Sequence, residues 1–299
     1  MESISTPSAA PTPTPEVDPA FEAHLVCASA RPAQRAPCDE PLPRQLQYER
    51  GAARVAHGRR LLHGAAAAAL MLAGTLALPA RAADSEGVAY KFTLGRYLSS
   101  DGNPAWDANL RGGQGPHTAW LGVYRDRAGL QQWRSGYEFR SDGEWLRSAL
   151  SLQNASGGTW VGAATAELGG TSYAIVGWGR TNLRDYINLN YDPNDAITLG
   201  VGTRALAGTE LTLFHVRDDR THSGQQVTHA VLRWRFGNAQ RLTVDLSSKR
   251  GLTGDGVFVR GNSVTLGYDH GPGFVRLAHD PHAGFSLPTQ NRISFGFRF

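Results

Sequence analysis

The chain ends on the alternating sequence Ile293-Ser294-Phe295-Gly296-Phe297-Arg298-Phe299. Large apolar side chains occupy every second position of this stretch, and small or polar residues lie between them. Successive side chains of a β-strand point to opposite faces, so this period of two gives one apolar and one polar face. The sequence therefore predicts an amphipathic strand that ends at Phe299.

The same alternation recurs from here back towards residue 88, in segments separated by Gly, Asp, Asn and Pro. A sustained helical period of 3.6 is not found after residue 85. Strands of about ten residues, tilted near 45°, match the hydrocarbon layer of a bilayer. We expect about fourteen strands, with twelve as the nearest alternative, at residues 88–98, 117–125, 130–140, 144–153, 159–168, 172–180, 185–191, 195–204, 209–217, 226–236, 241–250, 258–269, 273–280 and 289–299.

Charged residues lie in the middle of the polar faces. A soluble β-sandwich would expose them to water, whereas a membrane barrel would enclose them in a polar lumen. The residues expected to face the lumen are Arg134, Glu138, Arg147, Glu167, Arg233, Arg235, Arg241 and Asp245. Aromatic residues fall towards the strand ends, where the girdles of a membrane barrel lie: Tyr90, Tyr97, Tyr124, Trp133, Phe139, Trp145, Trp160, Tyr191, Phe236, Tyr268 and Phe299.

These patterns favour an all-β fold, an antiparallel up-and-down transmembrane β-barrel, over a secreted soluble β-protein. The longer connections all take odd numbers when the strands are counted from residue 88: Ser99–Pro116, Asp218–Gln225, Gly251–Val257 and Pro281–Pro288. Even-numbered connections are shorter: Asp126–Gly129, Ala205–Gly208, Gly237–Gln240 and His270–Pro272. Long external loops and short periplasmic turns are typical of outer-membrane barrels. Both ends of the barrel chain are therefore expected on the periplasmic side.

The first part of the chain is expected to lie outside the barrel. Residues 1–53 are rich in Pro and Ala and lack apolar periodicity, which predicts a disordered extension. Residues 54–82 combine a basic flank, an apolar run and a small-residue exit, which predicts a secretory signal peptide cleaved after Ala82. Its apolar run is too short for a transmembrane helix, which needs about 20 apolar residues. Translation from Val55 or Leu61 would place this signal at the N-terminus and make residues 1–53 a start-site artefact. The mature barrel then covers residues 83–299.

Composition excludes several functions for residues 83–299. Both cysteines, Cys27 and Cys38, precede this region, so it holds neither a disulfide scaffold nor a cysteine-based zinc site or nucleophile. The formal net charge is +4, but the arginines are dispersed among acidic residues. A nucleic-acid partner requires a clustered basic surface and is not expected. We expect no cofactor and no metal.

The signal peptide, the amphipathic strands and the terminal alternation together resemble the β-barrel proteins of Gram-negative outer membranes. In that class the barrel assembly machinery reads a terminal aromatic and its alternating neighbours, here Phe295, Phe297 and Phe299. The resemblance implies export through the inner membrane by the cleavable signal peptide and transit with periplasmic chaperones. It also implies residence in the outer membrane, in contact with its lipid and with lipopolysaccharide.

This class includes lipid-modifying enzymes such as phospholipases and lipid A deacylases, so we examined one cluster for hydrolase chemistry. Asp218, His222 and Ser223 are weak candidates for a catalytic set. The class motif places His and Ser two residues apart, followed by Asn and Gly. His222 and Ser223 are adjacent, and adjacent side chains of a strand point to opposite faces. A solvated external loop is therefore the favoured interpretation, and enzymatic activity is the less favoured one.

Two further features concern ligands. The sequence His279-Asp280-Pro281-His282 contains a single carboxylate, which favours a loop turn over a metal site. The lumen charges could select anions, because rings of Arg favour anion passage. Alternatively they could fill the lumen as a cross-strand ladder, for example Arg233 or Arg235 with Asp245. We favour a narrow or plugged lumen, and a non-enzymatic role as a narrow channel or as a structural or surface protein. The alternative function is an outer-membrane lipid-modifying hydrolase.

Overall fold

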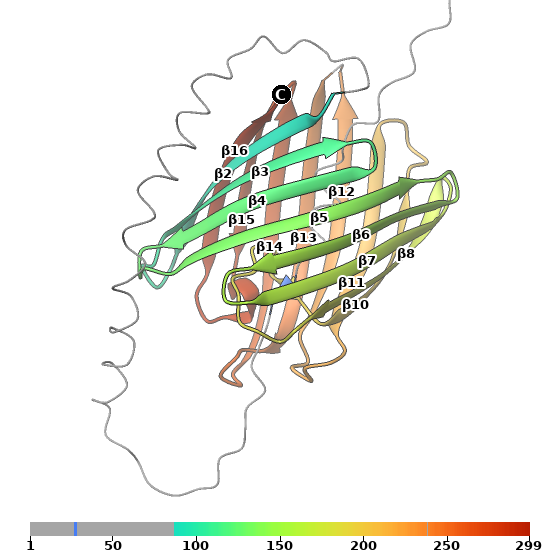
Figure 1. Cartoon of the computed structure of the whole chain (residues 1–299). Helices are drawn as coiled ribbons and strands as arrows, with labels where there is room; N and C mark the ends of the chain where they lie inside the picture. The colour runs from blue at the N-terminus through green and yellow to red at the C-terminus, as the bar shows by residue number, and fades with distance from the viewer. Residues whose placement is uncertain (1–26, 29–86, 238) are drawn as a thin grey trace, which may run out of the picture. The chain divides into compact units, whose positions relative to one another are not determined.

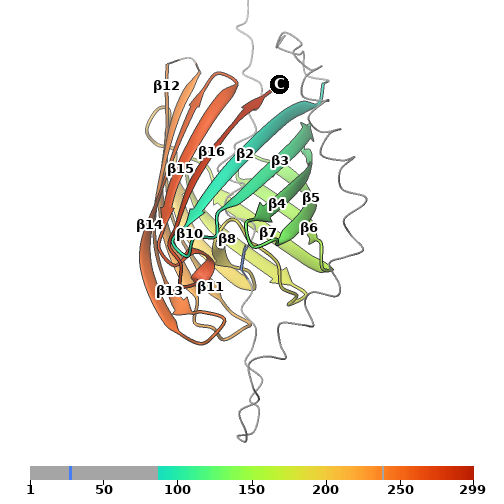
Figure 2. The same ribbon diagram turned by 90° about the vertical axis from the view of Figure 1, so that its left-hand side faces the viewer.

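The computed structural model describes residues 27–28, 87–237 and 239–299. Apart from residues 27–28, the expected extension at 1–53 and signal peptide at 54–82 lie outside the described residues. Antiparallel strands close into a barrel of fourteen strands (Figures 1 and 2). The barrel strands are β2 (Ala89–Ser99), β3 (Ala105–Gln114), β4 (His117–Asp126), β5 (Gln131–Asp142), β6 (Leu146–Ala155), β7 (Thr159–Gly169), β8 (Ser172–Thr181), β10 (Ala196–Thr203), β11 (Thr209–Asp218), β12 (Gln226–Phe236), β13 (Gln240–Leu252), β14 (Phe258–His270), β15 (Gly273–Asp280) and β16 (Gln290–Arg298).

The strand order follows the chain, because each strand pairs with the next and β16 pairs with β2 to close the barrel. The predicted up-and-down barrel and its count of fourteen strands are confirmed, and the alternative of twelve is excluded. Two short elements lie outside the barrel sheet: β1 (Cys27–Ala28) pairs in parallel with β9 (Asp192–Pro193), and a 3₁₀ turn, η2, covers Ala283–Phe285. No helix of the described residues is long and apolar enough to cross a bilayer.

The two faces of the wall are inverted relative to a soluble protein. The large apolar side chains of each strand point outward; Leu199 is 59% and Phe295 53% exposed. Polar and charged side chains between them are buried on the inner face, as Arg134 and Glu138 are on β5. Within hydrocarbon every backbone polar group must be paired inside the protein, which a closed sheet achieves. An apolar exterior on a closed sheet is the arrangement of a transmembrane barrel.

The terminal strand closes the barrel as its alternation predicts. Phe297 lies opposite Phe92 of β2, and their neighbours continue the antiparallel ladder. Phe299 extends it, because its backbone N donates to Tyr90 O at 3.0 Å and its O accepts from Tyr90 N at 2.8 Å. The rings of Tyr90 and Phe299 stack with centroids 5.6 Å apart.

The structure corrects two of the expected strands. Residues 105–114 were expected to lie in the connection Ser99–Pro116 but form β3. The apolar face of this strand is weak, whereas every second side chain, including Asp107, points inward. Residues 185–191, expected as a strand, belong instead to the connection between β8 and β10. One expected strand is absent and one unexpected strand is present, so the expected count of fourteen is unchanged. These two differences also reverse the direction of the strands between residues 117 and 180, so the connection after β4 lies at the opposite end of the barrel from the one expected.

The two ends of the barrel differ. We call the end where β2 begins and β16 finishes the terminus end, and the other the loop end. Turns at the terminus end are tight, as at residues 115–116, 170–171 and 271–272. The loop end carries the longer connections 182–195, 219–225, 253–257 and 281–289. This asymmetry matches short periplasmic turns and longer external loops.

Exposed aromatic residues lie at both ends of the barrel, where interfacial girdles are expected. Those at the terminus end are Tyr90, Tyr137, Phe139, Trp145, Trp234, Tyr268, Phe297 and Phe299. Three aromatics expected in a girdle lie elsewhere. Tyr97 and Tyr124 are buried on the inner face, and Tyr191 lies in the connection between β8 and β10 and packs against them. These three aromatic side chains therefore lie inside the barrel and not at the membrane interface.

Candidate functional site

The connection between β8 and β10, residues 182–195, folds into the barrel and is called the lumen segment below. Leu189 of this segment is 8% exposed and packs against Tyr97, Ala105 and Tyr124. These partners belong to β2, β3 and β4, which lie across the barrel from β8 and β10. The backbone N of Ile187 also donates to Gln132 Oε1 of β5 at 3.1 Å. The lumen segment therefore crosses the interior and meets the opposite wall.

A histidine ties the lumen segment to a second part of the wall. His229 Nε2 of β12 lies 3.0 Å from Asp192 Oδ1, and its Nδ1 lies 3.0 Å from Asp245 Oδ1 of β13. The Phe214 ring stacks on this imidazole with centroids 4.6 Å apart and an interplanar angle of 4°. Both ring nitrogens can donate only in the imidazolium form, so this geometry fits a cation held between two carboxylates.

A third set of contacts joins the segment to β16. Arg292 Nη1 donates to the carbonyl oxygen of Leu189 at 3.0 Å. The hydroxyl of Tyr191 bonds Gln290 Oε1, and Tyr191 itself is left-handed, with φ of 67°. A non-glycine residue in this region costs about 1–3 kcal/mol and persists only where its surroundings hold it. The lumen segment is thus held in one position by contacts along its length.

The C-terminal root of the lumen segment is fixed by Asp195, which is almost fully buried. Its carboxylate accepts from Thr181 Oγ1 at 2.7 Å and from Arg220 Nη1 at 2.8 Å. Next to it, the Tyr186 hydroxyl donates to Asn194 Oδ1 at 2.6 Å. These contacts join the segment to the end of β8 and to the loop after β11.

A cavity of about 110 Å³ remains between the lumen segment and the wall formed by β12 to β16. This space is large enough for a group of ordered waters but not for a bulky ligand. Charged side chains of both signs line it: Asp192, His229, Arg233, Asp245, Lys249, Asp269, Arg276, Asp280 and Arg292. The lumen is therefore polar and narrow at this level.

Nearer the terminus end, alternating charges form a ladder along the inner wall. Glu167 accepts from Arg204 at 2.6 Å and lies 3.9 Å from Arg147. Glu210 accepts from Arg204 at 2.6 Å and from Arg233 at 2.8 Å. The ladder connects β6, β7, β11 and β12 and lines this part of the inner wall with ion pairs.

Beyond the ladder, on β13 to β16 and β2, cations outnumber carboxylates. Arg241 and Arg298 both pair with Asp269, at 3.4 and 2.6 Å. The cationic groups of Lys91, Arg276 and Arg298 each lie 5.3 Å from the centroid of the buried Phe274 ring. Among the described residues, this part of the inner wall carries more cationic than anionic side chains.

The structure places the sequence-predicted lumen residues as follows. Arg134 and Glu138 are buried and pair with Asp107 and Arg140. Arg147, Glu167 and Arg233 belong to the ladder, Arg241 pairs with Asp269, and Asp245 contacts His229. Arg235 is exposed and lies opposite Arg241 near the terminus end.

The hydrolase candidates do not form a catalytic set. Ser223 Oγ donates to Asp218 Oδ2 at 2.7 Å, and the backbone N of Thr221 donates to Asp218 Oδ1 at 2.8 Å. Asp218 therefore stabilises the turn of its own loop. His222 is exposed with φ of 54°, and no hydrogen bond among the described residues joins it to Ser223 or Asp218. A histidine between the serine and the carboxylate is what such chemistry requires.

The residues around His279-Asp280-Pro281-His282 also point apart. His279 Nδ1 lies 2.8 Å from Asn291 Oδ1, whereas Asp280 faces inward and pairs with Lys249. His282 Nδ1 lies 3.2 Å from the carbonyl oxygen of Ser286. The described residues contain no cluster that could hold a metal ion.

The lumen segment was not predicted, because residues 185–191 were expected to form a strand. The sequence nevertheless carries a signal for a long loop here. The run Asn188-Leu189-Asn190-Tyr191-Asp192-Pro193-Asn194-Asp195 is dense in Asn, Asp and Pro, residues that strands disfavour. Its length, together with this composition, is typical of a long functional loop.

No family model and no curated protein matches the sequence. Solved structures with a similar arrangement include the Acinetobacter baumannii outer membrane protein Omp33, at 9% identity and a TM-score of 0.46 over 72% of this chain and 100% of that one. The KdgM porin, in complex with disordered oligogalacturonate, has 7% identity and a TM-score of 0.39 over 70% and 99%. A mutant porin of Rhodopseudomonas blastica has 11% identity and a TM-score of 0.39 over 71% and 99%.

The closed sheet, the apolar exterior and the charged, loop-filled interior define the class of this protein. It is a closed transmembrane β-barrel of fourteen antiparallel strands.

Proposed function

We propose that this protein is a narrow outer-membrane channel for small polar solutes, with the lumen segment as its constriction. The observation that supports this function is the lumen segment itself, which crosses the barrel, is anchored to several strands and leaves a cavity of about 110 Å³ beside the wall. A narrow space lined by charges of both signs excludes bulky solutes and admits small hydrated ones.

The proposed channel prefers anions. Lys91, Arg241, Arg276 and Arg298 lie near one carboxylate, Asp269, on the inner wall towards the terminus end. Arginines lining a pore favour anion passage. Among the described residues these cationic side chains lie on the terminus-end side of the constriction, where a passing solute meets them.

Planar-bilayer recording of the refolded barrel tests this function. The barrel with residues 184–191 replaced by a short Gly-Ser linker is expected to conduct several-fold more than the wild type, because the constriction is removed. The control replaces residues 253–257, a loop-end connection outside the lumen, with the same kind of linker. A wild-type barrel that does not conduct, together with a shortened variant that conducts no more, would contradict the channel and favour a structural or surface role.

A further inference from the structure

The outer surface of the barrel is asymmetric at the loop end. On β3, β5, β7 and β8 the outward positions near this end hold exposed tryptophans, as expected at a membrane interface: Trp106, Trp133, Trp160 and Trp178. On β11, β13 and β14 the corresponding outward positions hold Arg217, Arg250 and Arg260. Their immediate neighbours Val216, Lys249 and Val259 are buried on the inner face, so the three arginines face away from the lumen.

These arginines form a continuous row across four strands. Arg217 lies opposite Gln226, Gln226 opposite Arg250, and Arg250 opposite Arg260. Like charges directly opposite each other on neighbouring strands destabilise a sheet. The described residues offer these guanidinium groups no ion pair, and the outward positions of β11 to β14 include no carboxylate. An external anion would offset this repulsion.

A second polar row lies two residues closer to the middle of the barrel on the same strands. It consists of His215, Thr228, Ser248 and Asn262, which oppose one another in register. His215 Nδ1 lies 2.8 Å from Thr228 Oγ1, and the row contains no carboxylate. The basic row and this neutral row together make a polar band on a surface that otherwise faces lipid.

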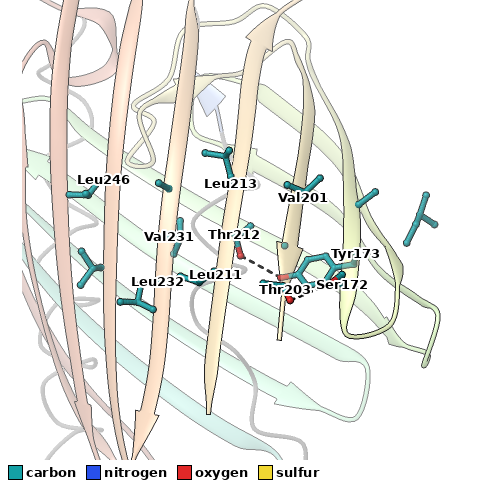
Figure 3. A pocket seen from close by; sticks show the side chains of 15 residues that line it. Ser172, Tyr173, Val201, Thr203, Leu211, Thr212, Leu213, Val231, Leu232 and Leu246 are labelled. Carbon is teal, nitrogen blue, oxygen red and sulfur yellow. Dashed lines mark hydrogen bonds between the residues drawn. The ribbon is translucent and has the colours of Figure 1, made fainter. Parts of the chain in front are cut away.

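Below the band, the outer wall is hollowed into an open apolar groove of about 880 Å³ (Figure 3). Leu213 lies opposite Ala230, which lies opposite Leu246, and Leu211 and Leu232 form the next row. The small side chain of Ala230 between two leucines deepens the groove. The groove and the arginine row lie on the same strands. One ligand can therefore lay apolar chains in the groove and bring anionic groups to the arginines.

We propose that this surface binds a phosphorylated lipid of the outer leaflet, lipopolysaccharide, with its phosphates at the row Arg217, Arg250 and Arg260 and its acyl chains along the groove. The planar guanidinium group matches phosphate oxygens in a bidentate manner and is the side chain suited to this contact. The loop end faces the outer leaflet, as the longer connections there indicate. A second copy of the chain docked by the same face would bring two arginine rows together, which charge repulsion opposes.

The test compares two variants that each remove two outward arginines at the loop end. Arg250→Gln/Arg260→Gln breaks the row, and the control Arg96→Gln/Arg125→Gln neutralises β2 and β4, where Arg96 already stacks on Trp106 at 4.5 Å. Barrels refolded in detergent are titrated with diphosphorylated lipid A, and bound lipid is counted by native mass spectrometry. Parallel titrations use dephosphorylated lipid A and inorganic phosphate. Heat-modifiable gel migration verifies that each variant is folded.

The wild type and the control are expected to bind diphosphorylated lipid A alike, whereas Arg250→Gln/Arg260→Gln binds it at least about tenfold more weakly. Dephosphorylated lipid and inorganic phosphate are expected to bind weakly to all three proteins. Conductance of both variants is expected to equal that of the wild type, because these arginines lie outside the lumen. Any of three results would overturn the proposal. These are an equal loss of lipid binding in both variants, lipid binding that survives removal of the phosphates, and inorganic phosphate bound as tightly as the lipid. A dimer that dissociates in Arg250→Gln/Arg260→Gln would also overturn it, since the surface would then be a contact between copies.

Discussion

His229 shows how one side chain holds the lumen segment in place. Its imidazole lies between Asp192, which belongs to the segment, and Asp245, which belongs to the wall, and it stacks on Phe214. Removing one partner from a buried ionic group leaves the others uncompensated, which costs more than the group's net contribution. The position of Asp192 therefore depends on the cation beside it.

We expect His229→Phe to destabilise the barrel by about 3–5 kcal/mol and to increase its single-channel conductance. The new ring retains the stack on Phe214 but leaves the carboxylates of Asp192 and Asp245 facing each other without a cation. Urea unfolding in lipid vesicles and planar-bilayer recording measure the two effects. The matched control is His215→Phe on the lipid side of β11, which should change neither by much. Unchanged conductance in His229→Phe would show that this residue does not position the segment.

Gly202 of β10 is required for close packing on the inner face. A Cβ built at this position would lie 2.3 Å from the Tyr173 ring, whose hydroxyl donates to Glu210 at 2.6 Å. At Gly162 of β7 a Cβ would meet nothing within 4 Å. The two glycines thus provide a matched pair in which only the surroundings differ.

Gly202→Ala is expected to destabilise the barrel by about 1–3 kcal/mol, because the Tyr173 ring must move from its contact with Glu210. Gly162→Ala should leave the free energy of unfolding nearly unchanged. Both values come from urea unfolding of the refolded barrel, followed by tryptophan fluorescence. Equal effects of the two substitutions would contradict the packing role of Gly202.

Whole elements show what the sequence could and could not predict. The strand at 289–299 was predicted almost to the residue, because one face is aromatic and every second residue is small or charged. At 105–114 the apolar side chains of the outward face are those of Trp106, Ala108 and Leu110, and glycine and glutamine complete this face. The apolar alternation was therefore too weak to reveal β3. The segment 185–191 contains apolar residues, but Leu189 packs inside the lumen against Tyr97, and only the tertiary fold determines that contact.

The same distinction applies to the lumen residues. Alternation placed Arg134, Glu138 and Glu167 on the inner face, where the structure has them buried. It could not identify their partners, because ion pairs such as Arg204 with Glu167 join side chains whose proximity depends on strand register. The partner of Arg134, Asp107, lies on β3, a strand that was not predicted.

The lumen segment is also held by an apolar anchor, and we expect Leu189→Ala to loosen it. Truncation of a buried leucine costs about 2–5 kcal/mol of packing, and here the loss falls on the contacts with Tyr97 and Tyr124. Current traces should show a higher mean conductance and larger fluctuations than the wild type. Leu206→Ala, in the exposed turn after β10, is the control and should leave the traces unchanged. A quiet trace of wild-type amplitude for Leu189→Ala would show that this anchor is dispensable.

The molecule as a whole is a sheet that the pairing of β16 with β2 closes into a barrel. Phe299 extends the β16–β2 ladder through two backbone hydrogen bonds to Tyr90. It also presents its ring on the outer face together with Phe295 and Phe297. Phe299 therefore takes part in closing the sheet.

Removal of Phe299 is expected to lower the amount of barrel in the outer membrane several-fold, while refolding into detergent continues. We propose that the barrel assembly machinery recognises the exposed aromatic row that ends at Phe299, whereas the other ladders of the barrel close without it. Heat-modifiable migration of membrane fractions measures the folded amount. Phe258→Ala, an exposed aromatic at the loop end, is the control. Equal membrane levels of the truncated and wild-type proteins would contradict a role of Phe299 in assembly.

The central claim is that one face of the barrel wall contacts lipid and the other faces an enclosed lumen. Spin labels at adjacent positions of β11 and β12 test this claim directly. Cysteine is introduced singly at Leu213 and Leu232, which face outward, and at Thr212 and Arg233, which face inward, with Cys27 and Cys38 replaced by serine. In lipid vesicles the outward labels are expected to collide preferentially with molecular oxygen, and the inward labels with a water-soluble nickel chelate. Equal exposure of both sets to the nickel chelate would contradict a barrel that turns its apolar face to lipid and its charges to an enclosed lumen.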